Sequence, residues 1–334
     1  MPTSVPSDRP VRWGLLGAGG IAGTVGADIA ASPHSEVAAV GARDLDRARR
    51  LADRLGAPRA YGSYAELVAD PELDVVYVAT THAQHHEHAL LAIEAGKPVL
   101  VEKAFTLTKA QADEVIAAAA GNDVFCMEAM WMRMNPLVIR ALEMVRGGAI
   151  GRVLSVTADH GQRFPFDAGH RLFDLGAGGG ALLDLGVYSA TFAWMFLGEP
   201  ASVTTTGHLS PTGSDSTLAM QWNYEDDRYA HVTCTTESST PCEGTVVGTD
   251  GWLRLGYPFY KPSELRVSTR AAGTEVLTEA LPGNGYGPQV AEVERCLRAG
   301  LPQSPLVPLA ETAAIMGLMD EARADLGVRY PADG

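Results

Sequence analysis

The first part of the chain alternates short apolar runs with amphipathic helical patterns. The runs contain few polar positions, as is typical of strands buried on both faces of a parallel sheet. The predicted strands cover residues 11–16, 36–42, 74–79, 99–101 and 124–127. The predicted helices between them cover residues 21–31, 44–55, 85–95 and 108–120. The pattern predicts an α/β Rossmann fold, a doubly wound parallel sheet, over residues 1–128.

The second part of the chain changes period and is dominated by strand patterns. The predicted strands cover residues 153–158, 202–208, 217–222, 230–236, 244–249 and 252–255. The turn Asp250-Gly251 joins the last two in a hairpin. Helical patterns recur only at 135–146, 182–196 and 289–326. We expect residues 129–334 to form an α+β domain with a largely antiparallel sheet, used for substrate binding and oligomerisation.

The net charge and the cysteine content bear on which partners and which cellular compartment the protein can have. The chain has 334 residues and a net charge of 26 − 40 = −14, which disfavours nucleic-acid and membrane-surface partners. Its four cysteines form no CxxC pair. They suit small buried side chains in a reducing compartment. No stretch reads as a membrane helix or a signal peptide, so we expect a cytoplasmic protein.

A glycine-rich turn lies between the first predicted strand and the first predicted helix. It has the pattern Gly17-x-Gly19-x-x-Ala22, in which the glycines allow a tight turn and close approach of backbone amides to a pyrophosphate. A structural glycine turn is the alternative, but the strand–turn–helix context favours a dinucleotide site. We predict cofactor contacts from Gly17, Gly19, Gly20, Ile21 and Ala22.

The end of the second predicted strand bears on the choice between NADP and NAD. The strand ends at Gly41-Ala42 and is followed by Arg43 and Asp44. A guanidinium can hold a 2′-phosphate with two parallel hydrogen bonds, which favours NADP. Asp44 could instead accept the ribose hydroxyl of NAD, or cap the following helix. We therefore expect NADP, with Arg43 as a ligand and NAD as the less favoured cofactor.

Two further segments follow predicted strands of the parallel sheet, at the edge where ligands bind. The first, residues 80–88, contains four histidines, but apart from His82 with His86 and His85 with His88 their spacing is not that of common zinc sites. We predict no metal there, and cofactor contacts from Thr80, Thr81, His82 and His85 instead. The second contains Glu102 and Lys103, which we also place at the cofactor. Lys103 could stabilise a developing alkoxide on the substrate, or simply pair with Glu102 at the surface.

Together these motifs resemble the glucose–fructose oxidoreductase/inositol dehydrogenase/MocA family over nearly the whole chain. The segments that carry the resemblance are GAGGIA at 17–22, TTHAQHHEHA at 80–89, GKPVLVEK at 96–103, GGGALLDLGVY at 178–188 and SPLVPLAET at 304–312. Further segments are similar to the branch of dimeric dihydrodiol dehydrogenases and NADP-linked D-xylose 1-dehydrogenases. These are ARDLDRA at 42–48, AYGSYAEL at 60–67 and MEAMWMR at 127–133.

The resemblance implies roles for particular residues. Lys103 and Tyr188 match the family's catalytic lysine and the acid/base tyrosine of this branch, and Asp184 matches the aspartate of the GGG…D motif. Trp131 and Arg133 match a segment that lines the substrate cleft. A nearby ammonium would favour the ionised form of the Tyr188 phenol.

The chain departs from the family at one position. The family's Glu-Lys-Pro is Glu-Lys-Ala here, because Ala104 replaces the proline. This change removes a stiff backbone constraint next to Lys103.

The resemblance implies an NADP-dependent dehydrogenase that acts on a carbohydrate, a cyclic polyol or a trans-dihydrodiol. Two alternatives remain open at this point: a non-catalytic dinucleotide sensor and an NAD-dependent glycosidase. The presence of both Lys103 and Tyr188 favours the dehydrogenase. The exposed face of an antiparallel sheet predicts a homodimer or a higher homo-oligomer.

Overall fold

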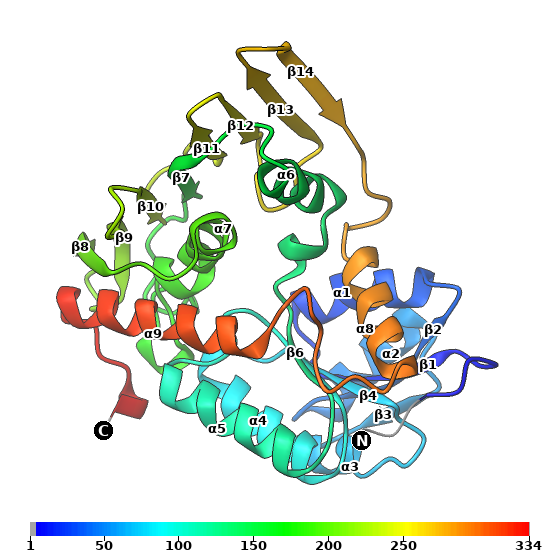
Figure 1. Cartoon of the computed structure of the whole chain (residues 1–334). Coiled ribbons are helices and arrows are strands. Elements are labelled where there is room, and N and C mark those ends of the chain that lie inside the picture. Colours follow the sequence, from blue (N-terminus) through cyan, green and yellow to red (C-terminus); the bar gives the residue numbers. More distant parts are fainter. Residues whose placement is uncertain (1–4, 334) are drawn as a thin grey trace. The chain divides into compact units, whose positions relative to one another are not determined.

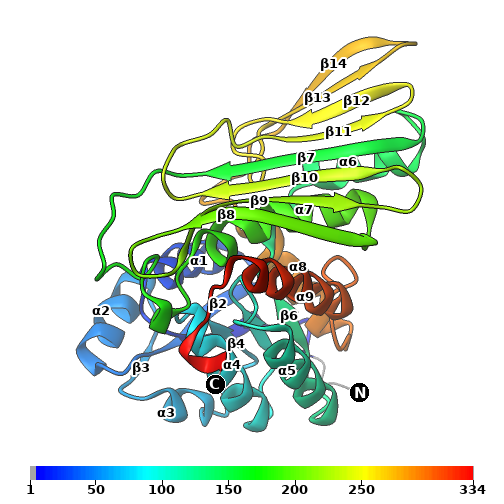
Figure 2. The same cartoon turned by 90° about the vertical axis from the view of Figure 1, so that its left-hand side faces the viewer.

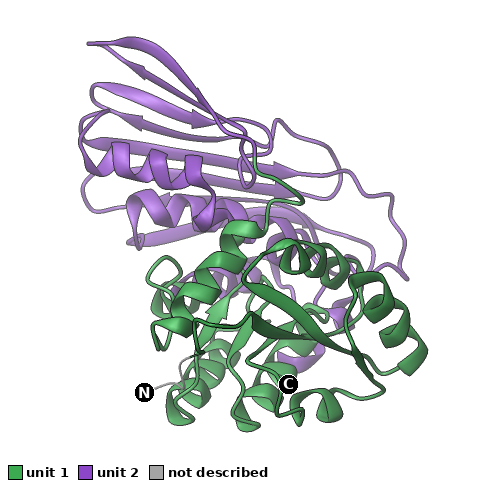
Figure 3. Ribbon diagram, turned by 90° about the vertical axis from the view of Figure 1, so that its right-hand side faces the viewer, with its two compact units in different colours: residues 1–131, 281–313 green, residues 132–280, 314–334 purple. Residues whose placement is uncertain are grey.

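The chain divides into two compact units, each built from separated segments. The computed structural model describes residues 5–333. Unit 1 comprises residues 1–131 and 281–313, and unit 2 comprises residues 132–280 and 314–334 (Figure 3).

Unit 1 contains a six-stranded sheet in which every neighbouring pair is parallel, in the order β3-β2-β1-β4-β5-β6. The strands are β1 (Val11–Leu16), β2 (Ser35–Gly41), β3 (Arg59–Tyr61), β4 (Val75–Val78), β5 (Val99–Val101) and β6 (Cys126–Glu128). The helices of the unit are α1 (Gly20–Ala31), α2 (Leu45–Leu55), α3 (Tyr64–Val68), α4 (His82–Glu94), α5 (Lys109–Gly121) and α8 (Gly287–Arg298). This strand order is that of the Rossmann dinucleotide-binding fold, so the fold predicted for this part is confirmed.

Local sequence signals set the ends of these elements. The side chains of Asp44, Ser63 and Thr108 accept hydrogen bonds from backbone N–H groups in the first turns of α2, α3 and α5. Gly56 ends α2 in the left-handed conformation, at φ 72°. The sequence patterns missed β3 and α3, because the strand has three half-exposed residues and the helix only five.

Residues 281–313 belong to unit 1, although the sequence patterns assigned all of 129–334 to a second domain. Helix α8 packs against α1. The carboxylate of Glu294 on α8 accepts hydrogen bonds from the hydroxyls of Ser32, at 2.8 Å, and Ser35, at 2.6 Å. The last helical pattern was predicted as a single region, but it is two helices, α8 and α9 (Leu309–Leu326), and α9 continues into unit 2.

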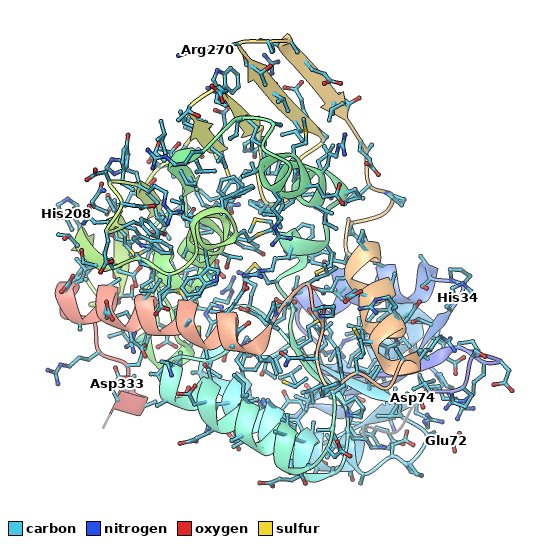
Figure 4. All side chains as sticks on the ribbon, viewed as in Figure 1. His34, Glu72, Asp74, His208, Arg270 and Asp333 are labelled. Atoms are coloured by element: carbon cyan, nitrogen blue, oxygen red, sulfur yellow. The ribbon has the colours of Figure 1, made fainter. Side chains whose placement is uncertain are left out.

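Unit 2 contains an eight-stranded sheet with the order β14-β13-β12-β11-β7-β10-β9-β8. Its strands are β7 (Val153–Gly161), β8 (Ser202–Leu209), β9 (Asp215–Asn223), β10 (Tyr229–Thr235), β11 (Gly244–Gly248), β12 (Gly251–Leu255), β13 (Glu264–Thr269) and β14 (Gly273–Thr278). Only β7 and β10 pair in parallel, which confirms a largely antiparallel sheet. The sequence patterns missed β13 and β14. His208 on β8 and Arg270 in the β13–β14 turn lie toward the two ends of this sheet (Figure 4).

One face of this sheet is covered by α6 (Pro136–Arg146) and α7 (Val187–Leu197) (Figures 1 and 2). A single turn of π-helix, Leu182–Gly186, called the π turn below, leads directly into α7. The stretch 175–197 is long and apolar enough to cross a membrane by length and composition, but 94% of its most apolar window is buried inside the protein. The buried part of this stretch, which includes α7, therefore belongs to the core of unit 2.

Candidate active site

The loops that follow β1, β4 and β5 open at one edge of the parallel sheet in unit 1. Backbone hydrogen bonds hold the ends of these strands together: the N–H of Ala79 donates to Leu16 at 2.9 Å, and that of Glu102 donates to Val78 at 3.0 Å. The winding of the sheet reverses between β1 and β4. In open α/β sheets ligands bind at this reversal point.

The glycine loop after β1 leaves room for a phosphate. Gly17 has φ 118°, and a Cβ atom there would lie 2.7 Å from the carbonyl oxygen of Ala79, so only glycine fits. At Gly19 and Gly20, by contrast, an added Cβ would meet no atom within 4 Å. Gly19 precedes α1 without a side-chain cap, and the first turn of α1 carries no acidic residue. Amide N–H groups and the positive end of the helix thus face open space that suits an anion.

Two arginines follow the end of β2, and one of them contacts this loop, whereas Asp44 caps the next helix. Asp44 caps α2 by accepting the N–H groups of Asp46 at 2.9 Å and Arg47 at 3.1 Å. Arg43 is exposed directly after the strand. The Nε atom of Arg47 donates to the carbonyl oxygen of Ala18, inside the glycine loop, at 3.1 Å. Arg47 was not predicted from the sequence, because only the fold brings the first turn of α2 against the glycine loop.

The histidine-rich segment forms the start of α4 and makes structural contacts. His88 Nδ1 lies 3.0 Å from the hydroxyl of Thr80, and His86 pairs with Glu114 at 2.7 Å on the surface. Thr81 precedes α4 but caps it with no side-chain hydrogen bond. His82 is buried in the first turn. In residues 5–333, no group of three or more His, Cys, Asp or Glu side chains is arranged to hold a metal ion.

His85 is buried between two backbone carbonyls. Its Nδ1 atom lies 2.9 Å from the oxygen of Ala104, and its Nε2 atom lies 3.3 Å from the oxygen of Thr80. Burial lowers the pKa of His85 to about 3, and the neighbouring His82 and Lys103 act in the same direction. The imidazole is therefore neutral. Its single proton is used at Nδ1, where the contact is shorter.

Glu102 lies buried beside Lys103 in the loop after β5. Its carboxylate accepts hydrogen bonds from the hydroxyl of Tyr77 and, at 3.2 Å, from the backbone N–H of Lys103. Burial raises the pKa of Glu102 to about 7, against the opposing effects of the Tyr77 hydrogen bond and the Lys103 charge. The alternative of an ordinary surface ion pair does not describe Glu102, which is 6% exposed. The Lys103–Ala104 peptide bond, which lacks the family's proline, is cis.

Trp131, at the end of the first segment of unit 1, stacks on Tyr286 at the start of α8. Their ring centroids are 4.2 Å apart and their planes differ by 26°. Asp28 on α1 holds the approach to Tyr286, because its carboxylate accepts the N–H groups of Asn284, at 3.0 Å, and of Tyr286, at 2.8 Å. No sequence pattern predicts this pairing, since Trp131 and Tyr286 are far apart along the chain.

Asp184 and Tyr188 lie in unit 2, on the π turn and the first turn of α7. Asp184 is 7% exposed and pairs with Arg171, whose nitrogens lie 3.2 and 3.4 Å from the two carboxylate oxygens. Tyr188 is 6% exposed. Arg133 is also buried in this unit. Lys103, in contrast, belongs to unit 1.

Two further rings surround Tyr188 and were not predicted. The ring of Tyr260 stacks on Tyr188 with a centroid distance of 4.9 Å, and His160 stacks on Tyr260 at 4.7 Å. The amide nitrogen of Gln162 lies 3.3 Å from both the hydroxyl of Tyr260 and the Nε2 atom of His160. The phenol of Tyr188 is thus held in a packed aromatic cluster rather than at a flexible surface.

Family comparisons match both parts of the chain. Residues 11–130 match the model described as "Oxidoreductase family, NAD-binding Rossmann fold". Residues 138–254 match the GFO/IDH/MocA C-terminal domain.

Individual relatives cover nearly the full chain. Trans-1,2-dihydrobenzene-1,2-diol dehydrogenase of Mus musculus is 36% identical over 337 residues, which cover 97% of this chain and 99% of the relative. D-xylose 1-dehydrogenase (NADP(+)) of Hypocrea jecorina is 33% identical and covers 96% of this chain and 93% of its own. Among solved structures, a 3-ketoreductase from Actinomadura kijaniata in complex with NADP and TDP-benzene superposes with a TM-score of 0.84 at 25% identity, covering 95% of this chain and 98% of its own.

Proposed function

Because this chain belongs to the GFO/IDH/MocA family of oxidoreductases, we propose that it is an NADP-dependent dehydrogenase. Its proposed substrate is a sugar, a cyclic polyol or a trans-dihydrodiol that is oxidised at a hydroxyl-bearing carbon. The observation that carries the proposal is the buried Glu102 beside Lys103, at the same carboxyl edge of the parallel sheet as the open glycine loop. The named activities of the mouse and Hypocrea relatives support this substrate range.

The glycine loop and its neighbours fit a dinucleotide. Gly17, Gly19, Gly20, Ile21 and Ala22 would hold the pyrophosphate at the start of α1. Thr80, Thr81 and His82 would line the cofactor from the loop after β4. We assign His85 to the support of the Lys103 loop instead, since both of its ring nitrogens contact backbone carbonyls.

The preference for NADP over NAD rests on the end of β2. Asp44 is occupied as the cap of α2, whereas Arg43 and Arg47 offer two positive charges beside the glycine loop. Guanidinium groups bind phosphate strongly and with defined geometry. A 2′-phosphate at this position would be bound by both arginines.

For the proposed reaction, the family resemblance implies a role for Lys103 and a role for Tyr188 in the chemistry of the substrate hydroxyl. Bound NADP supplies the hydride acceptor for oxidation, or the hydride donor for reduction in its reduced form. During oxidation, the ionised Tyr188 oxygen would take the hydroxyl proton and become a neutral phenol, while the Lys103 ammonium would hydrogen-bond the developing alkoxide. Asp184, held by Arg171, would orient the segment that carries Tyr188. Trp131 and Arg133 would contact the substrate.

We further propose a cytoplasmic homodimer with no nucleic-acid or membrane partner. All four cysteines are free and buried, as expected in a reducing compartment. The face of the unit 2 sheet opposite α7 carries Tyr229 and Val247, which are 41% and 36% exposed. Both pair with Ser155 across β7, so they share one face and would suit a second copy of the sheet.

An absorbance assay for reduced nicotinamide tests the dehydrogenase proposal. NADP and NAD are each offered with D-xylose, D-glucose, myo-inositol and a trans-dihydrodiol. We expect NADP reduction with one substrate, and its loss in Tyr188→Phe with unchanged NADPH binding. Tyr257→Phe, at a tyrosine that is 73% exposed, is the matched control. Tight NADPH binding without turnover on a wider substrate panel would favour a sensor, and aryl-glycoside cleavage without net cofactor turnover would favour a glycosidase.

A further inference from the structure

The π turn Leu182–Gly186 is anchored by side chains from three different strands of the unit 2 sheet. Asp215 on β9 accepts the N–H of Leu182 at 2.6 Å. The Nδ1 atom of His160 on β7 lies 3.2 Å from the carbonyl oxygen of Leu185. Cys234 on β10 packs against Gly186, where an added Cβ would lie 2.9 Å from its Sγ atom. π turns interrupt a helix at positions that are frequently functional, and this one carries Asp184.

Among these three contacts, that of Asp215 has the highest energetic cost, because it buries a carboxylate. The residue is 1% exposed, and its carboxylate accepts the backbone N–H of Leu182, at the amino end of the helical segment. The other oxygen, Oδ1, has no hydrogen-bond partner within residues 5–333. A negative charge at a helix amino end is favourable, but a buried carboxylate is a costly way to cap a helix. An exposed serine or asparagine would do so at lower cost.

The glycines of the GGGALLD segment make room for this carboxylate. Gly180 has φ 139°, and a Cβ atom there would lie 2.1 Å from Asp215 Oδ1. At Gly179 a Cβ would lie 2.6 Å from the carbonyl oxygen of Arg171. The hydroxyl of Tyr330 donates to the carbonyl oxygen of Gly179 at 3.1 Å. The glycine-rich motif and Asp215 therefore form one contact, although Asp215 itself lies outside the motif.

His160 holds the carboxyl side of the same turn. A carbonyl oxygen only accepts hydrogen bonds, so the Nδ1 atom of His160 carries the proton and Nε2 is left to accept from the Gln162 amide. The imidazole ring also lies 5.5 Å from the ring of Tyr188, measured between centroids. Asp215 and His160 thus fix the two sides of the turn that leads into Tyr188.

We propose that Asp215, together with His160, is a positioning residue that sets the orientation of Tyr188 and Asp184. The proposal rests on the proposed function, in which Tyr188 moves the substrate proton. Asp215 itself does not touch the reacting atoms. It acts through the backbone N–H of Leu182, and His160 acts through the carbonyl of Leu185.

The first test follows ionisation of the Tyr188 phenol, which needs no substrate. Ultraviolet difference titration of each protein against its own Tyr188→Phe counterpart isolates this one tyrosine. We expect Asp215→Ala to shift the Tyr188 titration by about one pH unit or more, because the phenol would no longer be held in its buried aromatic cluster. Asp215→Asn keeps an acceptor oxygen for Leu182 and should restore most of the wild-type curve. Identical curves for wild type and Asp215→Ala would overturn the proposal.

The second test uses steady-state kinetics. We expect Asp215→Ala to lower kcat about tenfold or more while KM for NADP stays unchanged, since the glycine loop lies in unit 1. Thr108→Ala, which removes a similar cap from α5, is the control for general loss of stability and should leave kcat unchanged. Equal losses of kcat in Asp215→Ala and Thr108→Ala would make Asp215 merely structural.

These tests distinguish failure of the proposed function from failure of the positioning role of Asp215. If no substrate is turned over by the wild type, the proposed function fails while the phenol titration still decides the role of Asp215. If Asp215→Ala does not fold, His160→Phe makes the same test from β7, and His160→Asn, which keeps a donor at the Nδ1 position, should rescue it. An unshifted Tyr188 titration in a folded His160→Phe protein would then overturn the proposal.

Discussion

The Nδ1 atom of His85 lies 2.9 Å from the carbonyl oxygen of Ala104, the residue that follows Lys103. This hydrogen bond ties the first turns of α4 to the loop after β5. Ala104 lacks the rigid ring that a proline would place directly after the lysine. The buried imidazole therefore supplies a restraint from outside the loop.

Replacing His85 should lower activity through Lys103. His85→Phe keeps a ring but leaves the Ala104 carbonyl without its donor, at a cost of about 1–3 kcal/mol of stability. We expect kcat/KM to fall about tenfold. His85→Asn places an amide N–H near the Nδ1 position and should lose less. His86→Asn, on the exposed side of α4, serves as the control. Full activity in His85→Phe would remove this histidine from the support of Lys103.

The raised pKa of Glu102 predicts a pH-dependent stability. Since the carboxyl binds its proton more tightly in the folded protein, with a pKa of about 7, than in the unfolded chain, the contribution of Glu102 to stability is largest at low pH. It should fall by about 2–3 kcal/mol as pH rises from about 4.5 through 7. Glu102→Gln cannot ionise and should flatten this slope in thermal unfolding curves. Glu275→Gln, at an exposed position, should keep the wild-type slope, and a slope of the same size in Glu102→Gln would contradict the assignment.

Arg47 should determine the choice of cofactor together with Arg43. Removing one charge-assisted hydrogen bond to a phosphate costs about 1.5–3 kcal/mol, so Arg47→Ala should raise KM for NADP about tenfold or more. KM for NAD should change little, because NAD has no 2′-phosphate. Arg49→Ala removes a 61% exposed arginine from the same helix and is the matched control. Parallel increases of both KM values would indicate damage to the loop rather than loss of a phosphate ligand.

Asp44 separates a capping role from a ribose-binding role. As the cap of α2, its replacement by alanine should cost about 1 kcal/mol of unfolding free energy. The ratio of kcat/KM for NADP to that for NAD should stay the same. Thermal unfolding and the two-cofactor assay measure both quantities on one protein. A selective loss of NAD use would instead place Asp44 on the ribose.

The proposed dimer predicts a sensitive position on the unit 2 sheet. Val247→Lys introduces a charge in the centre of the exposed row that includes Tyr229, and should shift the mass in light scattering from dimer to monomer. Leu306→Lys changes a similarly exposed apolar residue in unit 1 and should leave the dimer intact. A wild-type protein that is monomeric at micromolar concentration would remove the dimer from the proposal.

The sequence predicted the elements whose signals are local. The strands β1, β4 and β5 are continuous apolar runs, and α2 has both a cap, Asp44, and a terminating glycine, Gly56. Strand β14 was missed because five of its six residues are exposed and leave no alternating pattern. The π turn was predicted as ordinary helix, since nothing in its composition distinguishes the two forms.

The candidate site divides in the same way. Lys103, Tyr188 and the glycine loop stand in motifs that a sequence displays directly. Asp215 and His160 carry no motif, because their importance comes from contacts with residues that are distant along the chain. Arg47 likewise stands in no motif, because only the fold brings the first turn of α2 against the glycine loop.

Unit 1 is built from two segments that are far apart along the chain, and this has a consequence for folding during biosynthesis. A nascent chain that has emerged only as far as residue 131 lacks residues 281–313, and so lacks the helix that packs against α1. At that stage Asp28 and Ser35 lack their hydrogen-bond partners, Tyr286 and Glu294, which are translated more than 240 residues later. The Rossmann half of this protein therefore cannot finish folding on the ribosome ahead of the other half. An isolated fragment ending at residue 131 would remain open along that helix, as a client for chaperones rather than a free-standing domain.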